Sequence, residues 1–218
     1  PTFRQAQTGL WETYSAEELA TPEAWKENSA LVWGWYLWRM ARVKAATPNA
    51  GHLALAEYAK SHEVCFVTQN VDDLHERAGS KSVLHLHGRI FAHRCFQCGQ
   101  AFDAVTIPSP DDTPAAVSPP RCQHCEGEIR PGVVWFGESL PHEVFSAAVE
   151  ATHLCDVMLV IGTAGVVYPA ASLAAIAQRH GARVIEINPQ NTELSALADI
   201  CLRGGAAEVL PPLLMSSD

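Results

Sequence analysis

VMLVIGTAG at residues 157–165 and RVIEINPQN at residues 183–191 are the stretches that decide the fold. Each is a short run of β-branched and aliphatic residues followed by Gly, Asn or Thr, which is typical of a buried strand leading into a turn. Between them lies YPAASLAAIAQRH, residues 168–180, an Ala-rich segment of helical character. Strands that alternate with helical segments predict a parallel sheet of the α/β class.

A third strand is predicted at residues 64–67, which lead into TQNVDD. Ligands of parallel sheets gather at the carboxyl ends of strands, so the small and polar residues at these three ends predict a binding crevice. Two segments depart from the alternation: residues 12–47, rich in Trp and Ala, and residues 93–130, which hold paired cysteines. We expect these two segments together to form a second, smaller lobe. TIPSPDDTPAAVSPP, residues 106–120, is too rich in Pro, Ser and Asp to pack a core and predicts a loop.

Composition narrows the class of protein. A chain of 218 residues with 48% hydrophobic content is long enough for one sizeable core. Its 15 basic and 24 acidic side chains give a net charge of −9, which argues against nucleic-acid binding and suits lysine-bearing peptides better. The sequence shows no apolar run of membrane-spanning length and no leader peptide. We expect a soluble, cytoplasmic protein that contacts neither nucleic acid nor membrane; the sequence does not predict its oligomeric state.

Two C-x-x-C pairs predict a metal centre. The pairs are separated by 23 residues, close to zinc-ribbon spacing, and consist of Cys95, Cys98, Cys122 and Cys125. Four thiolates fill a tetrahedral zinc shell and leave no position for water, so the zinc is expected to be structural. A rubredoxin-like iron site uses the same ligands and is the alternative. The nearby His93 and His124 are expected to be surface residues.

The other three cysteines, Cys65, Cys155 and Cys201, lie in or beside apolar runs. There we expect them to act as small buried hydrophobic residues. An odd number of cysteines, four of them in metal-type pairs, indicates a reducing compartment rather than a disulfide framework.

One ordered set of motifs carries a family resemblance. TQNVD at residues 68–72 comes before the His87-Gly88 pair, with 15 positions from Asp72 to His87; the cysteine pairs follow, and then RPGVVWFGE at residues 130–138. Together with GTA at 162–164, IN at 187–188 and GGA at 204–206, this order closely resembles the sirtuin family over essentially the whole chain. A lone histidine would be a structural residue far more often than a catalytic one.

The resemblance implies a Rossmann-like parallel sheet domain with a smaller zinc-binding and helical module. NAD and acyl-lysine would meet in the cleft between the two lobes. The expected Rossmann-like domain comprises residues 1–11, 48–92 and 131–218. The helical part of the small lobe would comprise residues 12–47, and the zinc module residues 93–130.

The resemblance also implies the reaction. The acyl oxygen would attack C1′ of the nicotinamide ribose and release nicotinamide, and neutral His87 would remove a proton from a ribose hydroxyl. The products would be free lysine and 2′-O-acyl-ADP-ribose. Gln69 and the catalytic Asn70 would hold the ribose and a water, and Asp72 the nicotinamide carboxamide. The other implied NAD-binding residues are Phe3, Arg4, Trp11, Val71, Gly162, Thr163, Ala164, Asn188, Pro189, Gln190 and Ala206.

Gly162 and Thr163 would offer backbone amides to a phosphate or ribose. Family members usually have Ser where this chain has Ala164, so one hydroxyl contact is expected to be missing. Without the resemblance, ordinary turn chemistry would be the preferred interpretation of the residues at these strand ends.

The implied substrate-binding segment consists of Val133, Val134, Trp135, Phe136 and Gly137, which by resemblance pair with the substrate backbone as an added strand. From composition alone the segment would be a buried strand. Because main-chain pairing reads little sequence, broad tolerance around the target lysine is expected.

LVWGWYLWRM, residues 31–40, predicts a helix on which Tyr36 and Arg39 share a face. A solvated charge beside core aromatics is one interpretation. The other is a resemblance to the class III desuccinylase branch, whose Tyr-x-x-Arg pair grips the carboxylate of malonyl or succinyl lysine. Ala20 matches the small residue that lines the enlarged acyl pocket of that branch. Acetyl removal is expected alongside.

The chain opens at a point that matches the end of the family's phosphate-binding segment, so we expect an N-terminally truncated chain without the preceding strand and Gly-rich loop. Activity of the chain in that form is an open question. Two alternatives to a deacylase remain: a non-catalytic module that binds acyl-lysine or ADP-ribose, and a mono-ADP-ribosyltransferase.

Overall fold

The computed structural model describes residues 14–109 and 116–215, and the chain divides into two compact units. The first unit takes in the described residues up to 46, residues 70–72 and residues 87–140, and the second holds residues 47–69, 73–86 and the chain from 141 onward. The boundaries differ from those expected. Residues 87–92 and 131–140, expected in the Rossmann-like domain, fall in the first unit because strand pairing joins 88–95 to 129–133.

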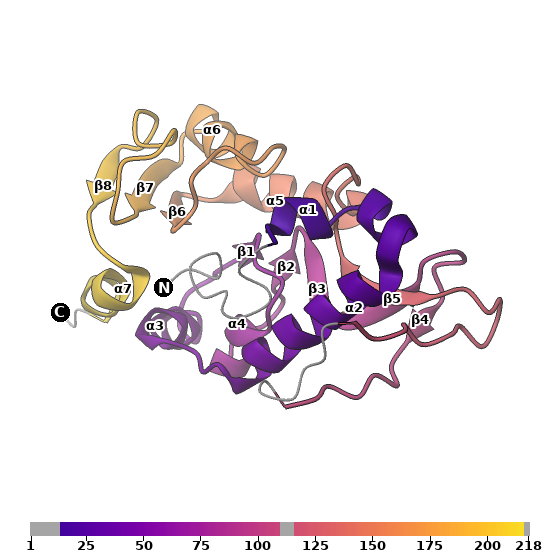
Figure 1. The fold of residues 1–218 in the computed structure, drawn as a ribbon. Helices are drawn as coiled ribbons and strands as arrows, with labels where there is room; N and C mark the ends of the chain where they lie inside the picture. Colours follow the sequence, from indigo (N-terminus) through magenta and orange to yellow (C-terminus); the bar gives the residue numbers. More distant parts are fainter. Residues whose placement is uncertain (1–13, 110–115, 216–218) are drawn as a thin grey trace. The chain divides into compact units, whose positions relative to one another are not determined.

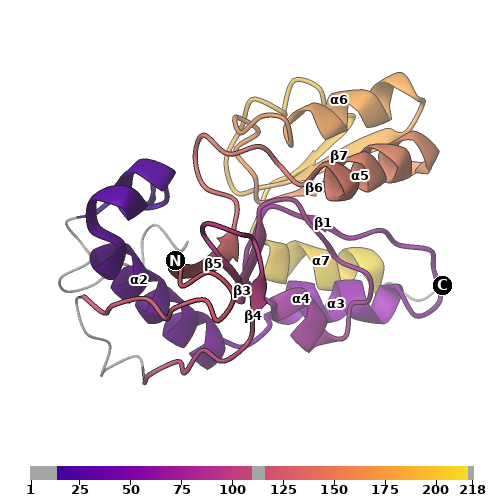
Figure 2. The same ribbon diagram turned by 90° about the vertical axis from the view of Figure 1, so that its right-hand side faces the viewer.

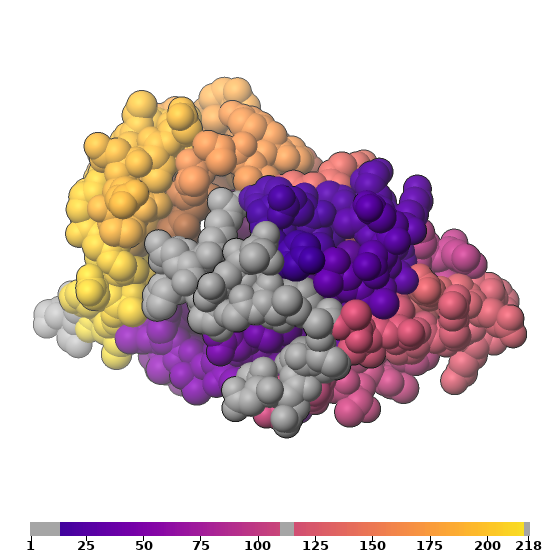
Figure 3. Space-filling model, in the orientation of Figure 1, coloured from indigo at the N-terminus to yellow at the C-terminus, as the bar shows by residue number. Residues whose placement is uncertain are grey.

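The first unit combines two helices with a small antiparallel sheet (Figure 1). The helices are α1 (Ala16–Leu19) and α2 (Pro22–Ala45), and the surface of α1 and the start of α2 is seen in indigo in Figure 3. The sheet has the order β4-β3-β5 and consists of β3 (Gly88–Cys95), β4 (Ala101–Phe102) and β5 (Ile129–Val133). The sheet and α2 share one hydrophobic core.

Helix α2 contains the predicted helix at residues 31–40 and begins where its sequence indicates. Thr21 caps it by accepting a hydrogen bond from the Ala24 amide (3.0 Å), and Pro22 occupies the first turn, where its missing N–H is not needed. Asn28 has non-helical angles (φ −151°), and its side chain accepts a hydrogen bond from the Leu31 amide (3.1 Å), so the helix restarts there.

The second half of α2 is buried on almost every side, and aromatic side chains dominate the core around it. The five tryptophans of the described chain all lie in this unit and are buried: Trp25, Trp33, Trp35, Trp38 and Trp135. A helix that is buried all round shows no amphipathic pattern, which is why its burial could not be predicted from its periodicity.

The second unit is the predicted α/β domain, with parallel strand pairing throughout its described residues. One sheet pairs β1 (Val67–Thr68) with β2 (Leu84–His85), and the other has the order β6-β7-β8. Its strands are β6 (Val157–Ile161), β7 (Arg183–Ile187) and β8 (Ile200–Leu202). The helices are α3 (Ala50–Tyr58), α4 (Leu74–Ala78), α5 (His142–Leu154), α6 (Ser172–Arg179) and α7 (Ala206–Leu214).

Helices cover both faces of the three-stranded sheet (Figure 2). Val160 and Val184 pack with Ala174 and Ala177 of α6, whereas Ile187 on the other face packs with α3 and α7. α3 and α7 lie side by side. They approach closely because Gly51 has no side chain: a Cβ there would lie 2.9 Å from the carbonyl oxygen of Ala206. This is the doubly wound arrangement expected from alternating strands and helices.

The strands at 157–161 and 183–187 have the predicted bounds, while the strand predicted at 64–67 is reduced to Val67–Thr68. The described parts of the predicted loop, 106–109 and 116–120, contain neither helix nor strand. None of the described helices is long and apolar enough to cross a bilayer.

Two expectations about burial are wrong. Cys65 and Cys201 are exposed, and only Cys155 is partly buried. His93, expected at the surface, is buried, with its ring 5.9 Å from that of Trp33. Burial lowers the pKa of His93 because a charged imidazole would lose its hydration there.

Candidate functional site

The four paired cysteines come together in the first unit. Their sulfur atoms lie within 4.8 Å of one another, and they are the only such group of metal-binding side chains among the described residues. The sulfur atoms of Cys95 and Cys125 are 3.5 Å apart, and those of Cys98 and Cys122 are 3.7 Å apart. Zn–S bonds of about 2.3 Å in a tetrahedron require sulfur atoms roughly 3.8 Å apart. The cluster therefore fits a structural zinc ion.

Backbone amides favour thiolates in this cluster. The amides of Gln97 and Cys98 donate to the Cys95 sulfur (3.4 and 3.5 Å), and the His124 amide donates to the Cys122 sulfur (3.4 Å). Burial acts to raise the pKa of Cys95, but these hydrogen bonds lower it to about 7. Thiolate is the form that binds metal. His124 is exposed, as expected.

His87 stands immediately before β3, at a point that requires glycine next to it. Gly88 has φ +74°, and a Cβ there would lie 2.1 Å from the carbonyl oxygen of Gly132 in β5. The carbonyl of His87 accepts a hydrogen bond from the Val134 amide (2.8 Å). The β3–β5 pairing therefore fixes the backbone that carries the candidate base.

The predicted nicotinamide-binding turn lies beside the same strand. The carbonyl of Val71 accepts a hydrogen bond from the amide of Ile90 in β3 (2.8 Å), and Val71 packs against the core of the first unit. Asn70 and Asp72 flank Val71 and belong to the same unit as His87. Residues far apart in the sequence, 70–72 and 87–90, are thus brought together as the motif order predicted.

The segment expected to pair with substrate alternates between burial and exposure. Val133 and Trp135 are buried, and Phe136 is 47% exposed. The amides of Val134, Trp135 and Phe136 donate to the His87 carbonyl, the Glu138 carboxylate and the Ala20 carbonyl, respectively. An added substrate strand would therefore pair through the carbonyl groups of this segment or through residues that follow it. The contact with Phe136 also places Ala20 beside the segment.

Tyr36 and Arg39 lie together in α2, as their spacing predicted. The Arg39 guanidinium carbon lies 5.4 Å from the centre of the Tyr36 ring and 4.6 Å from that of Trp35. Burial raises the pKa of Tyr36 to about 12, so its hydroxyl stays protonated at neutral pH. Burial also lowers the pKa of Arg39, while Tyr36 opposes that change.

Trp135 contacts this pair in a way that the sequence did not predict. Its indole N–H donates a hydrogen bond to the Tyr36 hydroxyl oxygen (2.9 Å), and both side chains are 1% exposed. The Tyr36 hydroxyl proton is then directed to another acceptor. The two residues are 99 positions apart, so no local pattern could indicate the contact.

An ion pair between buried Arg130 and partly buried Glu138 also contacts Trp135. The Arg130 guanidinium lies 3.3 Å from the centre of the Trp135 ring and donates to both carboxylate oxygens of Glu138. Burial acts to raise the pKa of Glu138, but hydrogen bonds from Arg130 and from the Trp135 amide, with the positive charge of Arg130, together outweigh it and the pKa is lowered. Phe96, between two zinc-binding cysteines, packs against Trp135 with ring centres 6.2 Å apart. Arg130 also lies 5.9 Å from the centre of the Phe96 ring, so the two side chains pack together against Trp135.

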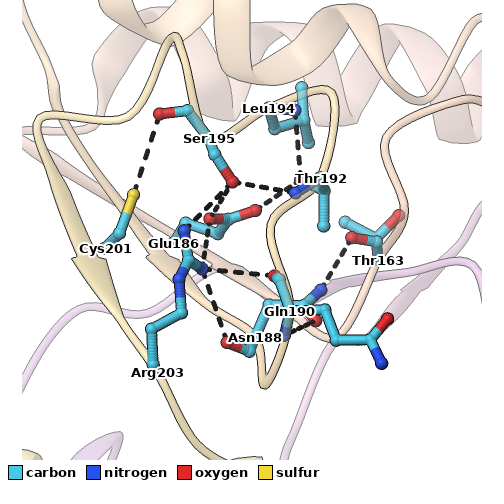
Figure 4. A network of polar contacts seen from close by, with 9 residues as sticks. All are labelled: Thr163, Glu186, Asn188, Gln190, Thr192, Leu194, Ser195, Cys201 and Arg203. Carbon is cyan, nitrogen blue, oxygen red and sulfur yellow. Dashed lines mark hydrogen bonds and ion pairs between the residues drawn. The ribbon is translucent and has the colours of Figure 1, made fainter.

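The second unit holds the other predicted NAD-binding residues at its strand ends. The Asn188 side-chain amide donates to the Thr163 carbonyl (3.0 Å), and the Gln69 side-chain amide donates to the Thr163 hydroxyl (3.3 Å). The Gln190 amide donates to the Asn188 side-chain oxygen (3.3 Å). The ends of β1, β6 and β7 thus meet in one network, part of which is drawn in Figure 4. The polar residues predicted to gather at the carboxyl ends of these strands thus lie together; the binding crevice there stays a prediction.

One predicted backbone donor is already engaged. The Gly162 amide donates to the Ile187 carbonyl (2.9 Å), so it is not aimed at a phosphate or ribose. Gly162 has φ +63° and turns the chain toward Thr163 and the exposed Ala164. Pro189 is exposed, and Ala206 is the first residue of α7. Phe3, Arg4 and Trp11 lie outside the described residues.

The four-cysteine cluster and the doubly wound α/β unit define the class as a zinc-containing Rossmann-like protein of the sirtuin type, and comparisons with known proteins agree. The family model described as "Sir2 family" matches residues 1–169. An "NAD-dependent protein deacylase" of Mycolicibacterium paratuberculosis is 49% identical over 214 residues, covering 98% of this chain and 90% of that protein.

Two solved structures are similar in fold. A Sir2 homologue in complex with NAD has a TM-score of 0.89 and 46% identity, covering 99% of this chain and 82% of that one. A mutant Sir2 homologue in complex with 2′-O-acetyl ADP ribose has a TM-score of 0.88 and 46% identity, covering 99% of this chain and 84% of that one. The chain belongs to the Sir2 family.

Proposed function

We propose that this chain is an NAD-dependent protein-lysine deacylase that removes succinyl and malonyl groups as well as acetyl groups. The general activity is supported by the relatives, which are named NAD-dependent protein deacylases. The observation that carries the proposal is the junction in the first unit, where the backbone of His87 is bonded to Val134 while Val71 is bonded to Ile90, three residues further along. The residues proposed as the base, as part of the nicotinamide-binding turn and as part of the substrate-binding segment are connected there.

The proposed roles follow from the chemistry of these residues. Asp72 would hold the carboxamide of nicotinamide, and Gln69 and Asn70 the ribose and a water. His87 would accept the proton of a ribose hydroxyl, so that this oxygen can receive the acyl group. The products would be nicotinamide, free lysine and 2′-O-acyl-ADP-ribose. The capture of 2′-O-acetyl ADP ribose by a Sir2 homologue is consistent with this product.

The acidic-acyl preference rests on Tyr36 and Arg39. A carboxylate at the end of a malonyl or succinyl chain would accept one hydrogen bond from the Tyr36 hydroxyl and up to two from the Arg39 guanidinium. Because Trp135 already donates to the Tyr36 oxygen, the hydroxyl proton is the group left for an acceptor. An acetyl group has no such carboxylate and would not use the pair.

The proposed activity is tested by mass spectrometry of a succinyl-lysine peptide incubated with and without NAD. We expect NAD-dependent loss of the succinyl group, and loss of turnover in a His87→Gln variant. No change in the peptide would support a non-catalytic binding module instead, and addition of ADP-ribose to the peptide would support a mono-ADP-ribosyltransferase. Either result would overturn the proposal.

Acyl preference is tested separately by Arg39→Met. Charge-assisted hydrogen bonds contribute roughly 1.5–3 kcal/mol each, so we expect kcat/KM for the succinyl peptide to fall roughly 10- to 100-fold. The value for the matched acetyl peptide is expected to stay within about threefold, because no carboxylate contact is lost.

Arg42→Met is the matched control, because Arg42 lies one turn along α2, also faces a tryptophan ring (5.5 Å from Trp38) and is exposed. It should leave both activities unchanged. Equal losses on the two peptides in Arg39→Met would reject the role of Arg39 in acyl choice.

A further inference from the structure

The turn that follows β7 is held in shape by side chains with no assigned role. Asn188, Pro189 and Gln190 form the turn that is proposed to bind the adenosine ribose of NAD. The carbonyls of Asn188 and Gln190 both accept hydrogen bonds from the Arg203 guanidinium (3.4 and 3.3 Å). One cation from the chain after β8 thereby bonds both ends of the turn (Figure 4).

Glu186 fixes that cation. It is the fourth residue of β7, its side chain is 1% exposed, and its carboxylate accepts a hydrogen bond from Arg203 (2.6 Å). The same carboxylate accepts hydrogen bonds from the hydroxyls of Ser195 (2.6 Å) and Thr192. A carboxylate buried to this degree is stable only when its oxygens are satisfied in this way.

The rest of the loop is organised by the same hydroxyls. The Thr192 amide donates to the Ser195 hydroxyl (2.9 Å), and the Leu194 amide donates to the Thr192 hydroxyl (3.1 Å). A second guanidinium nitrogen of Arg203 donates to Ser195 (3.1 Å). Residues 186–195 are thus closed into a ring of hydrogen bonds around the Glu186 carboxylate.

We infer that Glu186 and Arg203 are positioning residues for NAD: the ion pair between the buried Glu186 carboxylate and the partly exposed Arg203 guanidinium holds the 188–190 turn in the conformation that binds the adenosine ribose. This inference rests on the proposed function, since it takes the turn to be part of the NAD site. Neither side chain is assigned a contact with NAD. Their effect passes through the carbonyls of Asn188 and Gln190 and through the side chain of Asn188, which spans to Thr163.

The expected effect on the KM for NAD follows from the groups that the Glu186–Arg203 ion pair holds in place. Without Arg203 the two carbonyls would lose their shared donor, and Asn188 could leave Thr163. His87 and the segment proposed to bind the substrate peptide belong to the first unit, whereas Glu186, Arg203 and the 188–190 turn belong to the second. Loss of the pair should therefore raise the KM for NAD and leave kcat and the KM for the peptide nearly unchanged.

The test uses the full chain with three variants. Arg203→Lys keeps a positive charge near Glu186 but has a single nitrogen, so it cannot bond the two carbonyls and the Ser195 hydroxyl from two nitrogens as the guanidinium does. Glu186→Gln keeps the shape of the side chain and removes its charge. Glu57→Gln is the matched control, because Glu57 makes an exposed ion pair with Lys60 in the same unit, with both side chains more than half exposed. Initial rates are measured against NAD and against acyl peptide, and ADP-ribose binding by calorimetry.

We expect Arg203→Lys and Glu186→Gln to raise the KM for NAD and the dissociation constant for ADP-ribose about tenfold, the size of effect of one charge-assisted hydrogen bond. The peptide KM and kcat should stay within about twofold, and Glu57→Gln should match the parent chain. If Glu186→Gln does not fold, Arg203→Lys alone provides the test. It is expected to fold, because the Arg203 side chain is 34% exposed. Unchanged NAD and ADP-ribose affinity in folded Arg203→Lys overturns the inference, as does an equal loss on the peptide.

Failure of the proposed function gives a different result. A parent chain without NAD-dependent deacylation would reject that function, yet calorimetry with ADP-ribose would still report whether the pair shapes the turn. Binding of ADP-ribose that is tenfold weaker in Arg203→Lys would then support the positioning role alone.

Discussion

At the scale of single residues, the hydroxyl of Tyr36 illustrates how a neighbour sets the direction of a hydrogen bond. A tyrosine hydroxyl can donate and accept. Here burial keeps the Tyr36 hydroxyl protonated, with a pKa of about 12, and its oxygen accepts a hydrogen bond from the Trp135 indole N–H. The remaining proton therefore has a defined orientation. Trp135 itself packs against Arg130 and Phe96, so the orientation is prepared before an acyl group arrives.

Replacing Trp135 by phenylalanine tests this arrangement. The change keeps an aromatic ring and removes the N–H that fixes the Tyr36 hydroxyl, at a cost of about 1 kcal/mol for one hydrogen bond. We expect kcat/KM for a succinyl peptide to fall about fivefold and that for an acetyl peptide to stay the same. A double-mutant cycle with Tyr36→Phe provides the control. If the two changes were additive, the indole and the hydroxyl would act independently, and Trp135 would not orient the Tyr36 hydroxyl.

Contacts within one helical turn were predictable at this scale, and contacts across the chain were not. Tyr36 and Arg39 are three positions apart, so helix geometry alone places them together. The burial of His93 depends on Trp33, 60 residues earlier, so the prediction from local sequence that His93 lies at the surface is wrong. Glu186 sits in an apolar strand, and its partners Ser195 and Arg203 gave no motif that would reveal the pair.

At the scale of elements, the pairing of β3 with β5 positions much of the first unit's candidate site. His87 precedes β3, and the substrate-binding segment follows β5. The strands approach unusually closely at Gly88 and Gly132: a Cβ on Gly132 would lie 2.5 Å from the carbonyl oxygen of Ala92. Side chains at these positions would separate the strands and move both parts of the site.

The substitution Gly88→Ala should therefore damage both stability and activity. Left-handed backbone costs a residue with a side chain about 1 kcal/mol, and the clash with Gly132 adds roughly 1–3 kcal/mol. Gly181→Ala is the control, because Gly181 also has a positive φ (+90°) but a Cβ there would meet nothing within 4 Å. Urea unfolding and deacylation rates measure the two effects. Equal destabilisation by both variants would show that backbone strain, not strand contact, is the cause.

Element prediction succeeded where periodicity and turn residues agree. Apolar runs that end in Gly or Asn gave the bounds of β6 and β7, and α2 contains the predicted helix. The limits of the domains were harder to predict, because 88–92 and 131–133 are joined by strand pairing across the cysteine segment rather than by any local signal.

At the scale of the whole molecule, the metal is expected to hold the sheet of the first unit. Cys95 ends β3, and the second cysteine pair precedes β5, so zinc would tie the ends of both strands. Removal by a chelator should lower the melting temperature by several degrees and reduce the strand signal in circular dichroism.

The matched variants for this prediction are Cys98→Ser and Cys65→Ser, because both thiols are exposed and only Cys98 belongs to the cluster. Elemental analysis should give one zinc per parent chain, none or a weakly held ion in Cys98→Ser, and one in Cys65→Ser. A red protein containing iron would instead identify the rubredoxin-like alternative.

Acid should weaken the second unit through Glu186. Burial acts to raise the pKa of this carboxyl, but hydrogen bonds from Ser195, Thr192 and Arg203 lower it to about 2. A depressed carboxyl pKa stabilises the fold above the unfolded value, near 4.3, and this contribution of about 3 kcal/mol is lost as the pH falls toward 2. The free energy of unfolding of the parent minus that of Glu186→Gln should shrink between pH 5 and pH 2. A difference that does not vary with pH would contradict the assignment.

The placement of the tryptophans has an optical consequence. The first unit holds all five described indoles: Trp25, Trp33, Trp35, Trp38 and Trp135. Tryptophan fluorescence therefore reports on that unit far more than on the other. Thermal unfolding curves measured by tryptophan fluorescence and by far-ultraviolet circular dichroism will coincide only when the two units unfold together. A gap between the two curves would measure how independently the α/β unit can open.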